Sequence, residues 1–67
     1  MNLVLIFGRN VRAARKEKGW TQEQLAFEAG IKRAYLSEIE GGKRNPTLDI
    51  VEKLALALQK PASQLLE

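Results

Sequence analysis

The sequence predicts an all-α fold of five short helices in a single domain. Apolar residues recur at spacings of three and four over successive stretches, and glycine, proline and asparagine separate these stretches. No stretch alternates apolar and polar residues as a β-strand does. A length of 67 residues fits one domain, 1–67. The helices are expected at about 3–18, 22–29, 33–41, 48–58 and 61–66.

The first helix is predicted from one apolar stripe with basic residues on the opposite side. Gly19 is expected to end it. The stripe has 4-4-3-4 spacing and consists of Leu3, Phe7, Val11, Ala14 and Lys18.

The second helix has a strongly marked start and end. Thr21 can cap it, and Gln24, three residues later, completes a capping box. Trp20 and Leu25 stand at the two positions of a hydrophobic staple. Gly30 suits the left-handed conformation that ends a helix.

A third helix follows directly. Ile31 and Leu36 have staple spacing, Leu36 and Ile39 form an inner stripe, and Gly41 and Gly42 stop the helix. Two short helices joined by a tight turn at a glycine form a compact helix-turn-helix unit.

Two further helices complete the predicted bundle. Pro46 disfavours helix in the residue before it, Thr47 caps the fourth helix, and Asp49 lies in its positive first turn. The expected buried side comprises Leu48, Ile50, Val51, Leu54, Ala55 and Leu58. Pro61 starts a short fifth helix. The residues expected to close the core there are Ala62, Leu65 and Leu66.

Composition excludes several kinds of site. The sequence has no cysteine and no histidine, so disulfides, thiolate metal sites and the commonest general base are absent. The only candidate acids, Glu38 and Glu40, lie two residues apart and do not face each other on a helix. We therefore expect no enzyme activity, no metal and no cofactor.

The positive charge is unevenly distributed. The formal net charge is +3 and the pI is about 9.6. One basic group precedes Trp20, and Lys43 and Arg44 follow the helix-turn-helix. The first group comprises Arg9, Arg12, Arg15, Lys16 and Lys18. This favours a polyanionic partner, although a solvated surface also explains so modest a charge.

The apolar run 3–7 is too short for a signal peptide or a membrane span, so we expect a soluble, cytoplasmic protein without membrane contact.

The outer face of the third helix is the candidate DNA-reading surface. At 100° per residue, Leu36 and Ile39 define its inward direction. The candidate base-contacting residues on the outer face and its flank are Arg33, Ala34, Ser37 and Glu38. Arginine pairs with guanine, and glutamate accepts a hydrogen bond from cytosine N4. Serine can donate or accept a hydrogen bond, and alanine can touch a thymine methyl. Alternatively these are ordinary surface residues, and Glu38 repels phosphates to enforce selectivity.

Phosphate contacts are expected from the edges of the unit. Gln22 lies in the first turn of its helix, where free N–H groups favour anions. Tyr35 offers a hydroxyl on a flank, and Lys43 and Arg44 follow on a loop. A phosphate contact by Arg44 would strengthen binding to all sequences alike. The simpler explanation for each is an ordinary surface side chain.

TQEQLA followed by AGIKRAYLSEIEGGKRNPTL resembles the helix-turn-helix domain of lambda-type phage repressors and Cro, and especially the controller proteins of restriction–modification systems. The resemblance spans roughly Phe7 to Leu66 and implies a lambda-repressor-like five-helix domain. It implies base or phosphate contacts by Gln22, Arg33, Ala34, Ser37, Glu38 and Arg44. It also implies a salt bridge between Arg15 and Glu40, which the helical angle of Glu40 allows.

Two departures from the family pattern stand out. Lys32 replaces the usual Ser, Thr or Asp cap of the third helix, which weakens that start and makes Lys32 a candidate phosphate contact. Gln59 and Lys60 replace a glycine-containing turn before the fifth helix.

The resemblance implies a transcription factor that binds double-stranded DNA as a homodimer on a pseudo-palindromic operator, with the third helix in the major groove. Leu56 lies opposite the apolar stripe of the fourth helix. The predicted dimer interface comprises Leu56, Leu65 and Leu66. RNA polymerase is a further candidate partner.

The competing hypothesis is a protein-interaction module of antitoxin or adaptor type. Its support is the locally acidic centre formed by Glu23, Glu28, Glu38 and Glu40.

Overall fold

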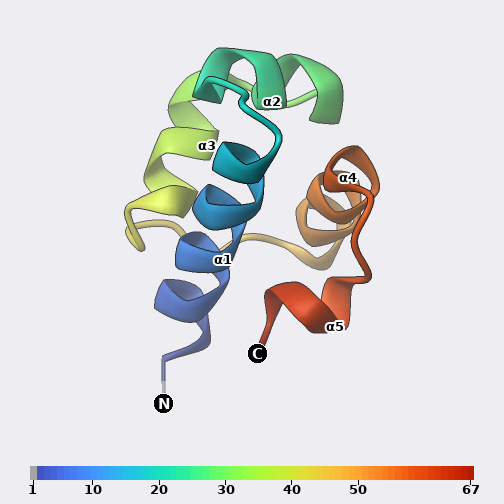
Figure 1. Cartoon of the computed structure of the whole chain (residues 1–67). Coiled ribbons are helices and arrows are strands. Elements are labelled where there is room, and N and C mark those ends of the chain that lie inside the picture. Colours follow the sequence, from blue (N-terminus) through green and yellow to red (C-terminus); the bar gives the residue numbers. More distant parts are fainter. Residues whose placement is uncertain (1) are drawn as a thin grey trace.

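The computed structural model describes residues 2–67, and the predicted all-α fold is confirmed. Within those residues the chain forms five helices and no strand (Figure 1). They are α1 (Leu3–Glu17), α2 (Gln22–Ala29), α3 (Arg33–Glu40), α4 (Leu48–Leu58) and α5 (Ala62–Leu65). Three helices are shorter than expected: α1 and α3 each end one residue early, and α5 is only four residues long. In residues 2–67 no helix is long and apolar enough to cross a membrane.

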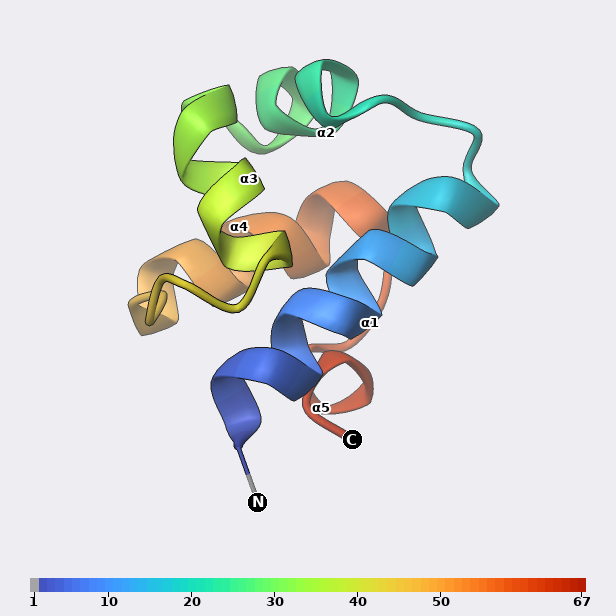
Figure 2. The ribbon, with the colours of Figure 1, turned by 90° about the vertical axis from the view of Figure 1, so that its left-hand side faces the viewer.

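The core lies where the five helices converge. α3 packs on α1, α2 packs on both α3 and α4, and α5 closes the space between α1 and α4. Figure 2 shows α3 beside α1, with α2 at the top of the view and α5 at the bottom. The largest fully buried side chains come from all five helices: Phe7, Val11, Leu25, Leu36, Ile39, Leu54, Leu58 and Leu65. The two helices of the helix-turn-helix are therefore held by the other three.

Four residues expected on buried stripes lie at the surface. Leu3 is exposed because it occupies the first turn of α1, and Lys18 lies beyond the last turn. Leu48, the first residue of α4, is 86% exposed, and Leu66, the C-cap of α5, is 38% exposed. All four stand at helix ends. The period of a helix gives the angle of a side chain but not whether a packing partner extends far enough to cover it.

The helix ends follow the chemistry of their caps. The capping box is present: Thr21 Oγ1 accepts from the Gln24 N–H at 3.1 Å, and Gln24 Oε1 accepts from the Thr21 N–H at 2.8 Å. Gly30 is left-handed, with φ of 71°. Lys32 makes no side-chain cap, as its departure from the family pattern predicts. Gln59 adopts φ of 58° and so forms the turn that a glycine would otherwise make.

Two close contacts fix α1 relative to the rest of the chain. A Cβ atom on Gly8 would collide with the carbonyl oxygen of Ile39, so α1 and α3 cross with their backbones almost touching. At the other side of α1, Asn10 Nδ2 donates to the carbonyl oxygens of Leu65 at 2.9 Å and Glu67 at 3.1 Å. This amide satisfies carbonyls that the end of α5 leaves free, and it anchors α5 on α1.

Candidate nucleic-acid interface

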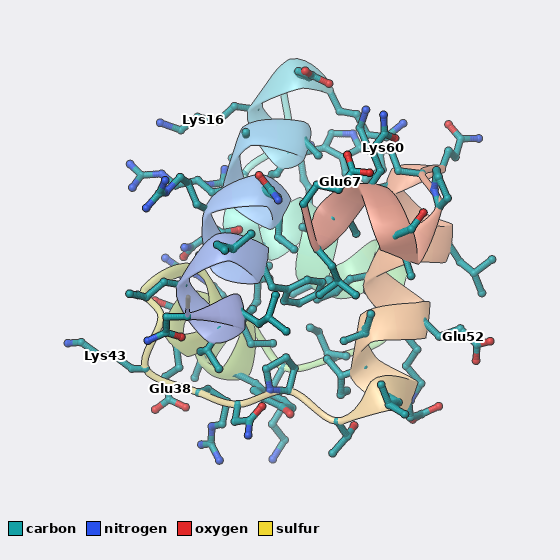
Figure 3. All side chains as sticks on the ribbon, turned by 90° about the horizontal axis from the view of Figure 1, so that it is seen from below. Lys16, Glu38, Lys43, Glu52, Lys60 and Glu67 are labelled. Atoms are coloured by element: carbon teal, nitrogen blue, oxygen red, sulfur yellow. The ribbon has the colours of Figure 1, made fainter. Side chains whose placement is uncertain are left out.

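The outer face of α3 carries the predicted base-contacting residues. Their side chains are all exposed: Arg33, Ala34, Ser37 and Glu38. Lys32, directly before α3, is also exposed, and Tyr35 on its flank is half-buried. In Figure 3, Glu38 and Lys43 project outward from the same part of the surface, whereas Glu52 on α4 projects from a different side. α3 and the loop after it thus present one continuous polar surface.

An ion pair beneath this surface ties α1 to the end of α3. Arg15 Nε donates to Glu40 Oε2 at 2.8 Å, and Nη2 donates to Oε1 at 3.0 Å. The two side chains are 10% and 3% exposed. The third donor, Arg15 Nη1, reaches the carbonyl oxygen of Trp20 at 2.8 Å. The structure therefore contains the expected pair. All three guanidinium nitrogens of Arg15 donate hydrogen bonds, which a buried charge requires.

Gln22 belongs to the same network. Its Nε2 donates to Glu40 Oε1 at 3.1 Å, which draws the first turn of α2 against α3. The amide nitrogen carries a second hydrogen that remains available. The first turn of α2 also leaves backbone N–H groups unpaired by the helix itself. Gln22 is therefore placed to donate to an anion while its orientation is set by Glu40.

A polar hollow of about 260 Å³ opens beside this network. It is lined by Arg12, Arg15, Gln22, Ser37, Glu40 and Gly41. The structure therefore brings the exposed Arg12 next to Gln22 and Ser37, a role that sequence reasoning did not assign to it. The signal was present, because Arg12 lies three residues before Arg15 and so on the same side of α1.

Two residues predicted to contact DNA are paired with each other. Arg44 Nη2 and Nε both donate to Glu38 Oε1, at 2.7 and 2.9 Å. The Arg44 guanidinium carbon lies 5.1 Å from the centroid of the Tyr35 ring, within the range of a cation–π contact. The hydrogen bond to Glu38, with the attraction of its carboxylate, raises the pKa of Arg44. The six-residue separation crosses a loop, so helical periodicity could not reveal this pair.

Phe27 is an exposed aromatic residue that sequence reasoning also missed. It is 82% exposed on α2. With Trp20, Glu23, Gln24 and Glu28 it borders a shallow surface hollow of about 540 Å³. The helical period of α2 was sufficient to find it, because Phe27 lies about 200° from the buried Leu25.

The three residues of the predicted dimer interface have different environments. Leu56 is 72% exposed, as its angle on α4 predicts, and Leu66 is partly exposed. Leu65 requires a correction: it is 2% exposed and packs in the core, so it has little side-chain area for a partner. Leu48, in the first turn of α4, is also exposed, and it borders one hollow with Leu3 and Leu66.

Comparison with known proteins agrees with this arrangement. Residues 11–65 match a family described as Helix-turn-helix. Control protein C.BamHI of Bacillus amyloliquefaciens is 45% identical, over 98% of this chain and 83% of that protein. The restriction–modification controller protein C.AhdI from Aeromonas hydrophila superposes with a TM-score of 0.89 at 40% identity, over 92% of this chain and 94% of that chain.

A third similar structure contains DNA. The regulator of biofilm formation SinR, solved in complex with DNA, superposes with a TM-score of 0.87 at 35% identity, over 91% of this chain and 98% of that chain. SinR is a transcriptional regulator of Bacillus subtilis. The chain therefore belongs to the helix-turn-helix family of DNA-binding transcription regulators, and restriction–modification controller proteins are among its relatives.

Proposed function

We propose that this chain regulates transcription as a homodimer that binds a pseudo-palindromic operator, with α3 of each copy in the major groove. The observation that carries the proposal is the exposed polar face of α3, which lies between the first turn of α2 and the basic loop at Lys43 and Arg44. In this arrangement α3 reads base edges in the groove, and residues on either side of it contact phosphates. Such a regulator acts in the cytoplasm.

Each residue of the surface has a proposed role. Arg33 pairs with guanine O6 and N7, Ser37 and Glu38 contact polar base edges, and Ala34 touches a thymine methyl. The proposed phosphate contacts are Gln22, Lys32, Tyr35, Lys43 and Arg44. We add Arg12, because it lines the same hollow as Gln22 and Ser37 and its guanidinium is exposed. Together these residues surround the base-contacting face of α3 with donors for phosphate oxygens.

Arg33→Ala is expected to relax the preference at one base pair and to cost about 1–3 kcal/mol on the operator. The arginine provides two directed hydrogen bonds that a wrong base cannot accept. Binding to the operator and to random duplex is measured by titration at fixed salt. Arg12→Ala is the control: it should weaken both duplexes alike and reduce the salt slope by about one. Equal losses on both duplexes for Arg33→Ala would refute its role as a base reader.

We propose that the dimer forms through the outer side of α4 and the end of α5. Leu48 and Leu66 are large apolar side chains exposed beside one hollow, and Leu56 is exposed elsewhere on α4. A palindromic site requires two copies related by a two-fold axis. Half-sites would then lie about 34 Å apart.

Sedimentation at high micromolar concentration should show a dimer that Leu66→Glu dissociates, because a charge buried in an apolar interface has no partner. The helical circular dichroism of the variant should be unchanged, since Leu66 is partly exposed in the single chain. A wild-type monomer, both with and without operator DNA, would exclude this interface.

Selection of bound sequences from a random duplex pool tests the proposed function most directly. A palindromic sequence with half-sites one helical turn apart supports a dimer with two reading helices. The sequence also supplies the operator for all variants. Recovery of no common sequence from the pool would contradict sequence-specific binding.

A second surface supports a protein partner as well. Phe27 is exposed on α2 between Glu23 and Glu28, and the hollow that it borders shares no lining residue with the polar hollow beside Glu40. An exposed aromatic residue flanked by acids suits a partner surface with basic residues. RNA polymerase, which a promoter-bound regulator meets, is the partner we propose.

If the chain is instead an antitoxin-like or adaptor module, it should lack salt-dependent binding to random duplex at low salt.

A further inference from the structure

The Glu38–Arg44 pair occupies the corner of the reading surface where α3 passes into the following loop. Two backbone hydrogen bonds fold this loop onto the last turn of α3: the Gly42 N–H donates to the Ile39 carbonyl at 3.0 Å, and the Lys43 N–H donates to the Glu38 carbonyl at 2.9 Å. Arg44 is thereby brought over the Glu38 side chain. The two side chains are about half exposed, so the pair forms at the surface where DNA is proposed to bind.

The geometry of the pair leaves specific atoms available. Both Arg44 bonds end on Oε1 of Glu38, and within residues 2–67 Glu38 Oε2 accepts no hydrogen bond and Arg44 Nη1 donates none. A free carboxylate oxygen can accept from an exocyclic amino group in the major groove, for which cytosine N4 is the usual donor to glutamate. The free Nη1 can donate to a phosphate oxygen. The pair can thus contact a base and a phosphate without separating.

Charge gives a reason for keeping the pair together on DNA. An unpaired carboxylate on α3 would be repelled by the phosphates on both sides of the groove. Contact with Arg44 offsets that repulsion locally. Two hydrogen bonds to one oxygen also restrict a side chain that otherwise samples many rotamers. The Tyr35 ring, 5.1 Å from the guanidinium carbon, restricts Arg44 in turn.

We propose that Arg44 positions Glu38 to read a base amino group, so that Arg44 determines sequence preference in addition to holding phosphate. This inference rests on the proposed function, and it departs from the expectation that Arg44 strengthens binding to all sequences alike. Arg44 acts here as a positioning residue, because the base contact is made by Glu38. Tyr35 supports the same geometry from the flank of α3.

The test uses the full chain and the operator obtained by selection. Binding is measured to that operator and to each single base-pair variant of one half-site, at fixed salt. Glu38→Ala first identifies the base pair whose preference depends on the carboxylate, with an expected loss of at least about fivefold. Arg44→Ala should reduce the preference at that same base pair by at least about fivefold, in addition to a uniform loss on all duplexes. The double variant should show no further loss of preference.

Two controls separate positioning from charge. Lys43→Ala removes an equal charge from the same loop without touching the Glu38 side chain, and it should lower binding to all duplexes by one common factor. Arg44→Lys keeps the charge but lacks the two guanidinium N–H groups that donate to one carboxylate oxygen. Compared with Arg44→Ala, it should therefore regain much of the uniform loss of affinity and little of the base preference. Thermal melting checks that each variant remains folded.

Different failures have different meanings. If Arg44→Ala lowers binding to every duplex by the same factor, Arg44 only holds phosphate and the inference is overturned. If Glu38→Ala leaves every base preference unchanged, Glu38 is not a reader and the inference is overturned as well. In both cases a wild-type chain that still selects a palindrome leaves the proposed function standing. A wild-type chain that selects no sequence overturns both proposals.

Discussion

Glu40→Ala is expected to lower the free energy of unfolding by about 3–5 kcal/mol, because it leaves the buried Arg15 charge without its partner. Arg15 would lose the acceptor for two of its three bonded nitrogens and keep only the Trp20 carbonyl. A domain of this size has a stability of about 3–5 kcal/mol in total. Urea unfolding followed by circular dichroism should therefore find the variant largely unfolded at 25 °C.

An exposed ion pair provides the matched control. Lys53 and Asp49 form an i,i+4 pair at 3.3 Å with both side chains largely in solvent. Lys53→Ala should change stability by no more than about 0.5 kcal/mol. The double variant Arg15→Met with Glu40→Leu should be more stable than Glu40→Ala, because no charge is left buried. Equal costs for Glu40→Ala and Lys53→Ala would show that burial adds nothing to the Arg15 pair.

The helices were predictable because their signals are local. Thr21 and Gln24 form a cap within one turn, and Gly30 ends α2 through its own backbone freedom. The spacing of Leu36 and Ile39 likewise determines which side of α3 faces outward, since the helical period requires no knowledge of the partner. The outer face of α3 could therefore be identified from the sequence, although its proposed contacts with DNA require the experiments above.

Features that depend on how helices meet were less predictable. Leu3 and Leu48 follow the apolar pattern but lie where no neighbouring helix covers them. The Gln22–Glu40 hydrogen bond and the Glu38–Arg44 pair join residues whose separation matches no helical spacing. The family resemblance suggested the Arg15–Glu40 bridge, but only the structure reveals that Gln22 joins it. The candidate surface is thus a network in which residues expected to act separately are bonded together.

Gly8→Ala is expected to lower the free energy of unfolding by about 2–3 kcal/mol, as overpacking does in a close-packed core. In an ordinary helix interior the same change is stabilising, by about 0.5–1 kcal/mol. Here the new methyl group would meet the backbone carbonyl of Ile39, which cannot rotate aside as a side chain can. α1 and α3 must separate, and the reading face of α3 must move with them. Urea unfolding measures the loss of stability. Titration with the operator should also show that the molecules that remain folded bind it less tightly, because α3 has moved.

Gly41→Ala separates this steric effect from the general effect of replacing a glycine. Gly41 has φ of −82°, which any residue adopts, and a Cβ atom there would lie 3.4 Å from the Ser37 carbonyl oxygen, an ordinary contact. This variant should be as stable as the wild type or up to about 1 kcal/mol more stable, because alanine restricts the unfolded chain. Opposite signs for the two substitutions would establish that α1 and α3 are held at a distance only glycine permits. A stabilising Gly8→Ala would mean that the helices can move apart without loss, and that the position of α3 does not depend on this crossing.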